Sequence, residues 1–352
     1  MSDPSPQSEI NGSHGAMLGL CTTVLVVGAL SLAQSVFAPL AFALFIIALV
    51  WPLQKRLQAT MPRLLALAFT MAVTILVVIV FTSLVAWGVG RVGRYIISDA
   101  ARLQAHYDSV AIWLEGHGIA LTELWAEYLN GAQLIRIAQE ITSRLNTVAG
   151  FSIVALIYVL LGLLEVDETC RKVRTYGNGI FGKALLVGGS KTAVKFRKYM
   201  LVRTLMSAVT GLLVWAFAWL SGLPLSAEWG LIAFSLNYIP FIGPFVATLL
   251  PTLFAMAQFG SLQTAILVFA CLNVIQFVVG SYLEPRFAGS ALSISPFVVL
   301  FSVFFWTFVW GLPGAFIGVP IAIAVLTLCE QHPSGRWAAD LFGRPSNDHD
   351  QF

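Results

Sequence analysis

Charged residues are scarce in this chain of 352 residues, because Asp, Glu, Lys and Arg make up only 11% of it while hydrophobic residues make up 58%. Soluble domains contain about 25% charged residues. With a mean hydropathy of +0.84, the composition excludes a large soluble protein and indicates an all-α polytopic membrane protein embedded in a lipid bilayer. The net charge of +3 is too small to indicate a nucleic-acid partner.

Cysteines and catalytic groupings are also scarce. No Ser-His-Asp arrangement, no paired carboxylates within the apolar segments and no phosphate-binding loop occur in the sequence. The sequence therefore predicts no enzyme, no cofactor and no metal site, and an ATP-driven pump would need a separate subunit. The four cysteines stand singly, without metal or redox spacing, and are expected to be small buried side chains: Cys21, Cys170, Cys271 and Cys329.

The first 90 residues predict a polar tail followed by three membrane helices. Residues 1–16 form the tail and lack the basic start of a cleaved signal peptide, so the apolar run after it is predicted to be retained. That run, 17–50, would overshoot a bilayer of about 30 Å as a single helix. We therefore expect a helical hairpin that turns near Ala38-Pro39, and a third helix over 64–90; together these make up the N-terminal membrane helices, 17–90.

Two polar regions determine the predicted orientation. Segment 91–146 has five basic and six acidic residues and is predicted to be an external insertion of amphipathic helices. Segment 147–203 combines a span at 148–164 with a stretch, 165–203, that holds nine basic residues. The positive-inside rule makes that stretch cytoplasmic. In the basic stretch, three lysines share one helical face, which predicts a segment on the membrane surface: Lys191, Lys195 and Lys198. In the insertion, the apolar residues with helical spacing are Leu121, Leu124, Trp125, Tyr128 and Leu129.

The segment 204–330 is interpreted as a transport core with further spans. These are 204–221, 229–257, 262–283 and 296–328. About eight crossings in total place the N-terminus and the C-terminal tail, 331–352, in the cytoplasm of a bacterial cell whose inner membrane holds the protein.

Two apolar segments of this core are interrupted by proline and glycine. A proline inside a helix removes a backbone donor and costs about 3 kcal/mol or more, and such a break is tolerated in a membrane only within protein or beside a wet cavity. Paired interruptions point to the substrate site of a transporter. The alternative is that both are kinked or re-entrant packing elements. The interrupting residues are Asn237, Pro240, Gly243 and Pro244 in the first segment, and Gly311, Gly314 and Pro320 in the second.

Few other polar side chains lie in the core. Asn273 and Gln276 share one face of an apolar helix and are candidates for lining the substrate path, although neutral amides also tie helices together. Glu284, close to Arg286, and Glu228 are the candidates for gating or ion coupling. For Glu284 and Arg286 the alternative is an exposed ion pair.

Several motifs resemble those of the autoinducer-2 exporter family, also called PerM-like permeases. They are Asn237-x-Ile239-Pro240-x-x-Gly243-Pro244, then Pro285-Arg286, and Ser295-Pro296 followed by Trp310-Gly311-x-x-Gly314 and Val319-Pro320. Ser295 stands where the family commonly has histidine. The resemblance extends from the first hairpin to about residue 330 and implies a multi-span protein of the bacterial inner membrane that exports small molecules as a homo-oligomer. Some members are linked to the quorum-sensing furanone, and others to exchange of sodium or lithium for protons.

The favoured function is secondary export of a small polar, autoinducer-2-like molecule by alternating access, with the path at the broken segments. A first alternative is a sodium or lithium/proton antiporter, which usually needs a carboxylate in the membrane core, and the sequence places none there clearly. A second is a non-transporting scaffold that acts through 91–146. The scaffold would tolerate Pro240→Ala and Gly243→Leu but not deletion of 100–140, whereas transport predicts the opposite.

Overall fold

The computed structural model describes residues 6–102, 131–176, 180–288, 294–331 and 335–342, with the single positions 105, 112 and 116. Every regular element in these residues is a helix, which confirms the all-α fold. In chain order they are α1 (Pro6–Leu32), α2 (Gln34–Gln58), α3 (Arg63–Ser98), α6 (Gly131–Tyr176), α7 (Ile180–Leu220), α8 (Ser226–Leu236), α9 (Ile242–Phe259), α10 (Leu262–Phe277), the π-helix η1 (Val278–Leu283), α11 (Glu284–Ala288), α12 (Pro296–Glu330) and α13 (Arg336–Phe342).

Many of these helices are long and apolar enough to cross a membrane, which confirms a polytopic membrane protein. Within the described residues seven stretches meet this criterion, and Met17–Leu32 of α1 is a shorter apolar helix. The seven are Gln34–Gln58, Arg63–Ser98, Val148–Tyr176, Leu185–Leu220, Ile242–Phe259, Leu262–Phe287 and Pro296–Glu330.

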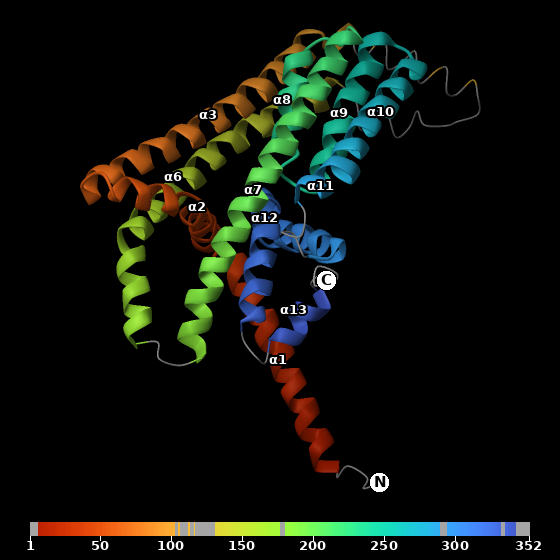
Figure 1. The fold of residues 1–352 in the computed structure, drawn as a ribbon. Coiled ribbons are helices and arrows are strands. Elements are labelled where there is room, and N and C mark those ends of the chain that lie inside the picture. The colour runs from red at the N-terminus through yellow and green to blue at the C-terminus, as the bar shows by residue number, and fades with distance from the viewer. Residues whose placement is uncertain are drawn as a thin grey trace, which may run out of the picture.

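The helices α3, α6 and α7 are much longer than a bilayer is thick. They contain 36, 46 and 41 residues, which correspond to about 54, 69 and 62 Å against a hydrocarbon layer of about 30 Å. Figure 1 shows the C-terminal part of α6 and the N-terminal part of α7 descending side by side. The basic stretch 165–203 is therefore mostly helix rather than loop, because α6 continues to Tyr176 and α7 begins at Ile180.

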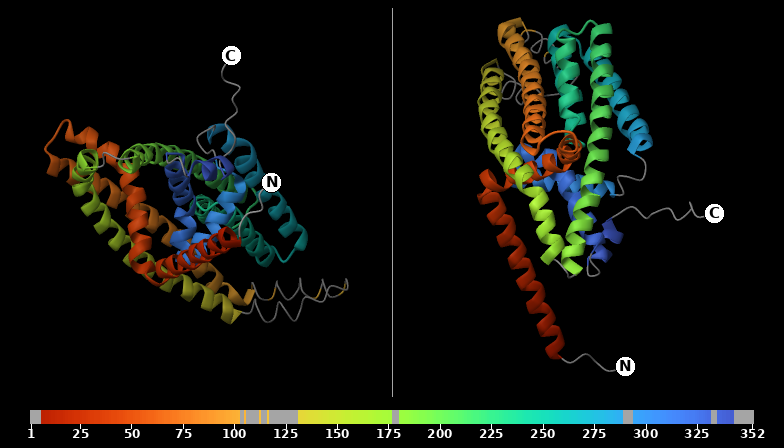
Figure 2. Two further views of the ribbon diagram at one scale, coloured as in Figure 1. Left: turned by 90° about the horizontal axis from the view of Figure 1, so that it is seen from below. Right: turned by 60° about the vertical axis from the view of Figure 1, so that its left-hand side comes forward.

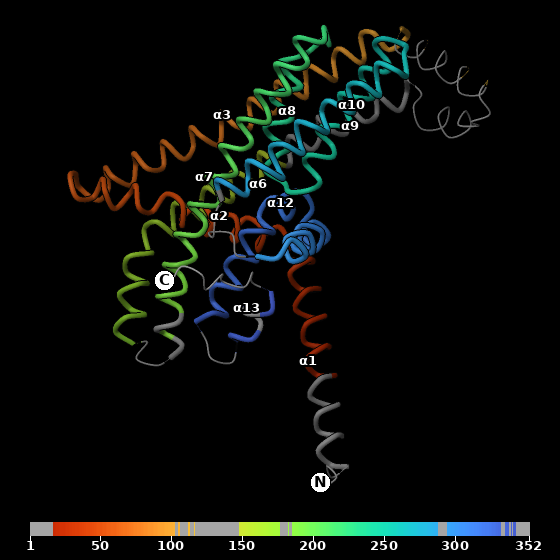
Figure 3. Tube along the Cα trace, turned by 45° about the vertical axis from the view of Figure 1, so that its right-hand side comes forward, coloured from red at the N-terminus to blue at the C-terminus, as the bar shows by residue number. Residues whose placement is uncertain are grey.

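The break in the first apolar run does not lie near Ala38-Pro39, so the predicted position is wrong. The helix ends at Leu32, and Ala33, with φ −99° and ψ 31°, separates α1 from α2. Pro39 lies inside α2 and is buried together with Ala38, so packing against neighbouring helices offsets the single backbone hydrogen bond that the proline removes. Near this break α1 packs on α12, where the carbonyl of Leu30 accepts a hydrogen bond from the Nε1 of Trp310 at 3.0 Å. Toward its N-terminus α1 projects away from the other helices (Figure 1, Figure 2, Figure 3).

The predicted insertion 91–146 begins and ends within helices. The helix α3 continues to Ser98, and α6 begins at Gly131. The amphipathic stretch from Leu121 to Leu129 lies outside the described residues. Because α3 and α6 carry the chain into and out of this region without a break at residue 90 or 147, the insertion is continuous with the membrane helices that flank it.

Two groups of buried apolar side chains organise the C-terminal half. One joins the end of α7 to α8, α9 and α10 and includes Val214, Trp229, Ala233, Phe254 and Leu272. The other joins α2 to α12 and includes Phe45, Ile239, Trp310, Ile317 and Ile323. Between apolar helices in a membrane, such groups stabilise the fold by close van der Waals packing. Ile239 belongs to the second group although it directly follows α8, so the two groups meet where α8 ends.

Candidate functional site

The segment 229–257 is a helical hairpin rather than a single span. The helix α8 has 11 residues, or about 16 Å, which is too short to cross a membrane. After the break the chain returns along α8 as α9, since the rings of Trp229 near the start of α8 and Phe254 near the end of α9 lie 5.3 Å apart. The first broken segment is therefore re-entrant in form, one of the two possibilities that the sequence left open.

A strained turn forms the tip of this hairpin. Phe241 has φ 63° and ψ −56°, a rare conformation for a residue with a side chain. The N–H of Ile242 donates to the carbonyl of Pro240 at 2.7 Å, which closes a γ-turn of the strained form. Pro240 lacks the donor that would have continued α8. Strain of this kind persists only where the surrounding packing enforces it, and it is concentrated at functional sites.

Gly243 allows the two arms of the hairpin to approach at the tip. A Cβ atom on this residue would lie 1.9 Å from the carbonyl oxygen of Leu236, a separation that no side chain tolerates. Pro240 is buried and Pro244 is half-buried beside it. Proline and glycine thus have separate roles here: the first ends α8, and the second permits α9 to start against it.

The second broken segment also folds back on itself. Within α12 the backbone breaks at Gly311, where φ 64° and ψ −141° are accessible only to glycine. A Cβ atom on Gly314 would lie 1.8 Å from the carbonyl oxygen of Trp306, and one on Gly318 would lie 2.7 Å from that of Ser302. The part of α12 after Gly311 therefore runs back along the part before it.

Both segments contain the sequence Phe-Ile-Gly, at 241–243 and at 316–318, but the two copies do not occupy equivalent positions. In the first segment, Phe241 is in the turn and Ile242 and Gly243 begin α9, whereas in the second the turn is at Gly311 and Phe316 to Gly318 lie within the returning helix. Pro320 is likewise inside that helix and buried. What the two segments share is a glycine that lets opposite arms make contact.

The two hairpins meet through an aromatic contact. Tyr238, at the tip of the first, stacks on Phe316 of the second with ring centroids 5.7 Å apart and an interplanar angle of 22°. Phe42 of α2 packs against Phe316 with centroids 5.6 Å apart, and Phe81 of α3 packs edge-on to Tyr238 at 5.7 Å. The junction between the broken segments is thus lined by aromatic rings from α2, α3, α12 and the turn between α8 and α9.

Polar side chains of α7 face the tip of the first hairpin. Asn237 is buried, and its Nδ2 donates to the Oγ of Ser207 at 3.3 Å. The hydroxyl of Tyr238 donates to the Oγ1 of Thr204 at 3.1 Å. One turn beyond Ser207, Gly211 lets α7 and α8 cross closely, because a Cβ atom there would lie 2.8 Å from the carbonyl oxygen of Gly230. The helix α7 is therefore the rigid partner of the hairpin tip.

A buried ion pair lies next to these groups on α7. The Nη1 of Arg203 is 2.9 and 3.0 Å from the two carboxylate oxygens of Glu284, and the side chains are 7% and 23% exposed. Glu284 therefore pairs with Arg203 rather than with Arg286, whose guanidinium lies 4.1 Å from the ring centroid of Tyr282. Glu284 follows the π-helix η1, an element that often marks functional sites in helices.

Two donors beside this pair are unsatisfied. Neither the Nε of Arg203 nor the hydroxyl of Tyr199, one turn earlier on α7, has a hydrogen-bond partner among the described residues. Unpaired buried polar groups are costly in a membrane interior, and ionisable residues there indicate functional sites.

The remaining predicted residues lie apart from this junction. Glu228 is buried at the start of α8, at the opposite end from Asn237, and pairs with the Nη1 of Arg91 at 2.9 Å. Asn273 is exposed and donates to the carbonyl of Phe269 in its own helix at 2.8 Å. Gln276 is half-buried with an unpaired Nε2. Within the described part of the chain, no three His, Cys, Asp or Glu side chains gather in a way that could hold a metal ion.

Sequence reasoning missed the contribution of α7. Tyr199, Arg203 and Ser207 recur every four residues and so share one helical face, but Arg203 was assigned to the basic stretch that precedes the span. The spacing was a usable signal: two polar residues and a tyrosine on one face of a helix that is otherwise apolar indicate an inward-facing polar stripe.

Comparison with known proteins gives concordant matches over nearly the whole chain. The sequence model of the family described as "AI-2E family transporter" matches residues 20–334. The chain is 27% identical over 328 residues to the "AI-2 transport protein TqsA" of Escherichia coli (strain K12), which covers 92% of this chain and 94% of that protein. It is 24% identical over 347 residues to the "Putative transport protein YhhT" of the same strain, covering 96% and 97% of the two chains.

Proposed function

Because the chain belongs to the AI-2E family of transporters, we propose that it is a secondary transporter that exports a small polar molecule across the bacterial inner membrane. One relative is named as an AI-2 transport protein, so an autoinducer-2-like solute, and with it a role in quorum sensing, is the first to test. The observation that carries the proposal is the meeting of two broken hairpins at Tyr238 and Phe316, with the buried Asn237 beside them.

The substrate path would run through this junction. Where α8 ends and α9 begins, helix ends present partial charges that an intact helix does not offer. The side chains of Asn237 and Tyr238 add neutral hydrogen-bonding groups, now bonded to Ser207 and Thr204 on α7. A polar solute would exchange these bonds for its own. The other path residues would shape the backbone. Pro240 and Pro244 interrupt the helix at the tip, and Pro320 is buried in the returning part of α12. Close approach of the hairpin arms is permitted by Gly243, Gly311 and Gly314. Asn273 and Gln276 would enter the path only if α10 turned.

Alternating access would move two blocks of helices past each other. One block is held by the buried group around Trp229 and Phe254, and the other by the group around Trp310 and Ile317. Their aromatic junction would be the seal that opens and closes, and unstacking one such aromatic pair costs about 0.5–1.5 kcal/mol beyond its buried area. The proposal extends to a homo-oligomer, as the family resemblance implies.

The two hairpins alter the proposed topology. If both are re-entrant, the linker 284–295 lies on the same side as the basic part of α7, whereas eight simple crossings would put it on the opposite side. The contact between Glu284 and Arg203 supports the first arrangement, whereas the contact between Glu330 and Lys195 fits both. Both arrangements leave the N- and C-termini in the cytoplasm.

A second candidate function, exchange of a cation for protons, gains support from the ion pair. The sequence placed no carboxylate in the core, but Glu284 pairs with a buried arginine on α7 and Glu228 is itself buried. A carboxylate that is released from Arg203 could carry a proton or a cation, and Arg286, held over Tyr282, would not take part. A scaffold that acts through 91–146 is the third candidate and makes the path residues dispensable.

Transport in proteoliposomes tests these functions together. Efflux of a labelled furanone-type solute, sodium flux and proton flux are measured in parallel under imposed gradients. Solute movement that is lost in Gly243→Leu and kept after deletion of 100–140 supports export. Sodium and proton movement without solute movement supports exchange. A folded protein that moves none of them under any gradient contradicts both transport proposals.

A further inference from the structure

The outward face of α7 alternates lysine with exposed aliphatic side chains. Val187, Lys191, Val194, Lys198 and Leu201 follow one another at spacings of three or four residues and so lie on one face of the helix. Val187, Val194 and Leu201 are 45%, 57% and 71% exposed, and both lysines are exposed. The lysines keep such a face out of the protein interior, and the exposed aliphatic side chains make full exposure to water unfavourable.

The length and the charge pattern of α7 indicate that this face is near the boundary of the hydrocarbon layer. The helix spans about 62 Å, roughly twice the thickness of the layer, and its lysines are confined to the N-terminal half, since no lysine follows Lys198 in the chain. The exposed aliphatic side chains continue beyond them, with Leu205 44% exposed. Lysines at such a boundary reach toward the headgroups while their stems cover apolar surface.

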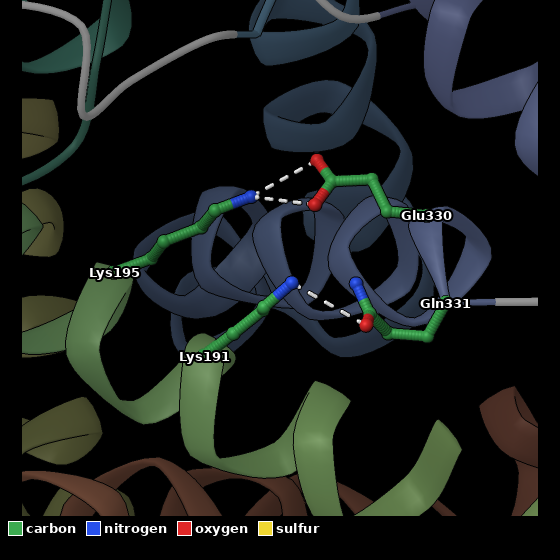
Figure 4. Close-up of polar contacts among 4 residues, drawn as sticks. All are labelled: Lys191, Lys195, Glu330 and Gln331. Carbon is green, nitrogen blue, oxygen red and sulfur yellow. Dashed lines mark hydrogen bonds and ion pairs between the residues drawn. The ribbon is translucent and has the colours of Figure 1, made fainter. Parts of the chain in front are cut away.

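Two of these lysines line a shallow hollow and contact two polar side chains at the C-terminal end of α12. The Nζ of Lys195 lies 3.0 and 3.2 Å from the carboxylate oxygens of Glu330, and the Nζ of Lys191 lies 3.4 Å from the Oε1 of Gln331, as Figure 4 shows. The hollow is lined by Ser190, Lys191, Val194 and Lys195. Two ammonium groups, those of Lys191 and Lys195, line the hollow beside the single carboxylate of Glu330, and Lys198 follows on the same face of α7, so the site retains a net positive charge.

We propose that this face binds one anionic phospholipid. Its phosphate would bridge Lys191 and Lys195, with Lys198 adding charge, and an acyl chain would lie along Val194 and Leu201. In the absence of the lipid, the carboxylate of Glu330 pairs with the ammonium of Lys195. Exchange of this partner costs little because exposed ion pairs are weak, whereas a lysine near an anionic lipid surface contributes an attraction of about five-fold in affinity.

The apolar wall of the hollow selects a lipid over a free anion. A soluble phosphate would use only the two ammonium groups, whereas a phospholipid also covers Val194 and Leu201, which are more than half exposed. The proposal concerns a lipid site outside the substrate path, so it is independent of which solute or ion the protein moves.

Lipid titration of the delipidated full-length protein tests the site. Binding of phosphatidylglycerol, phosphatidylethanolamine and glycerol phosphate is measured by native mass spectrometry for wild type, Lys191→Gln/Lys195→Gln and Glu330→Gln. The double variant should bind phosphatidylglycerol roughly 25-fold more weakly, and Glu330→Gln should bind it more tightly because the competing carboxylate is removed. Lys55→Gln/Lys172→Gln is the matched control, since both residues carry the same charge and pair elsewhere, with Asp167 and Glu168.

The expected pattern has three parts: preference for phosphatidylglycerol, loss in the double variant, and no loss in the control. Equal binding of both lipids, or an unchanged double variant, overturns the proposal. Competition by glycerol phosphate at the same concentration as the lipid would also overturn it, because it would assign the site to a soluble anion. None of these measurements depends on transport, so failure of the proposed function leaves the result interpretable.

Discussion

Replacement of Gly243 by alanine probes the tip of the first hairpin with a single methyl group. The added Cβ atom would lie 1.9 Å from the carbonyl oxygen of Leu236, whereas ordinary contacts begin at 3.4 Å. The two arms would therefore have to separate by about 1.5 Å at this point. The neighbouring atoms are backbone, so no flexible side chain can absorb the shift.

The cost of this separation follows from the packing of the tip. Overpacking a well-packed site typically costs about 1–3 kcal/mol, which shifts a two-state balance by roughly 5- to 150-fold. Opening the arms also separates the stacked rings of Tyr238 and Phe316, whose centroids are 5.7 Å apart. It lengthens the 3.3 Å hydrogen bond from the Nδ2 of Asn237 to the Oγ of Ser207. We expect the rate of transport to fall by a factor within this range.

The assay compares initial transport rates in proteoliposomes and thermal stability in detergent. Gly150→Ala is the control, because Gly150 is also in a helix and a Cβ atom there meets nothing within 4 Å. A helical glycine replaced by alanine should slightly stabilise the protein. Gly314→Ala, with its Cβ atom 1.8 Å from the carbonyl oxygen of Trp306, should reproduce the effect in the second hairpin.

One result would refute the reasoning. If Gly243→Ala transports at the wild-type rate and melts at or above the wild-type temperature, as Gly150→Ala should, then the close approach at the tip does not exist in the membrane. A loss of stability with an unchanged rate would show that the tip supports the fold but lies outside the path.

Three further predictions address the ion pair, the aromatic junction and the topology. Arg203→Met should destabilise the protein strongly because it leaves Glu284 without its partner, while Arg203→Met/Glu284→Met should recover stability in a thermal melt; if transport also recovers, the pair has no part in it. Tyr238→Phe keeps the ring stacked on Phe316 and loses only the hydroxyl bond to α7, so stability should fall by about 1 kcal/mol, and a larger change in substrate affinity than in stability would mark a substrate contact. In a cysteine-free background, Arg286→Cys should react with a membrane-impermeant thiol reagent only from the side that labels Lys191→Cys; labelling from opposite sides would contradict the re-entrant hairpins.

Much of the fold was predictable because each membrane helix corresponds to one continuous apolar run in the sequence. Long apolar runs require helices, since no water is available to satisfy the backbone. The helices α3, α10 and α12 begin within one residue of the predicted 64, 262 and 296, whereas the spans predicted from 148 and 204 lie inside the longer helices α6 and α7. The breaks at Pro240 and Gly311 were also predictable, because each residue type acts on its own backbone. The first break was misplaced at Pro39 because local propensity is weak compared with packing, and the helix α2 runs through this proline.

The polar part of the site was only partly predictable. Asn237 lies beside the junction of the two hairpins, whereas Asn273 is exposed on α10 and bonds to its own helix. Both are amides in apolar segments, so composition could not separate them. Arg203 was missed because it follows a run of basic residues in the sequence, yet in the structure it is buried against Glu284 on a distant helix.

The sequence by itself determined that this protein is helical, crosses a membrane and breaks two of its apolar segments, because each of these follows from the chemistry of residues close together in the chain. Only the tertiary structure decided that both breaks are hairpins that meet at Tyr238 and Phe316. It also decided that Glu284 forms its ion pair with Arg203 rather than with Arg286. These pairings join residues from 78 to 81 positions apart, and such contacts depend on how whole helices pack, which no local pattern specifies.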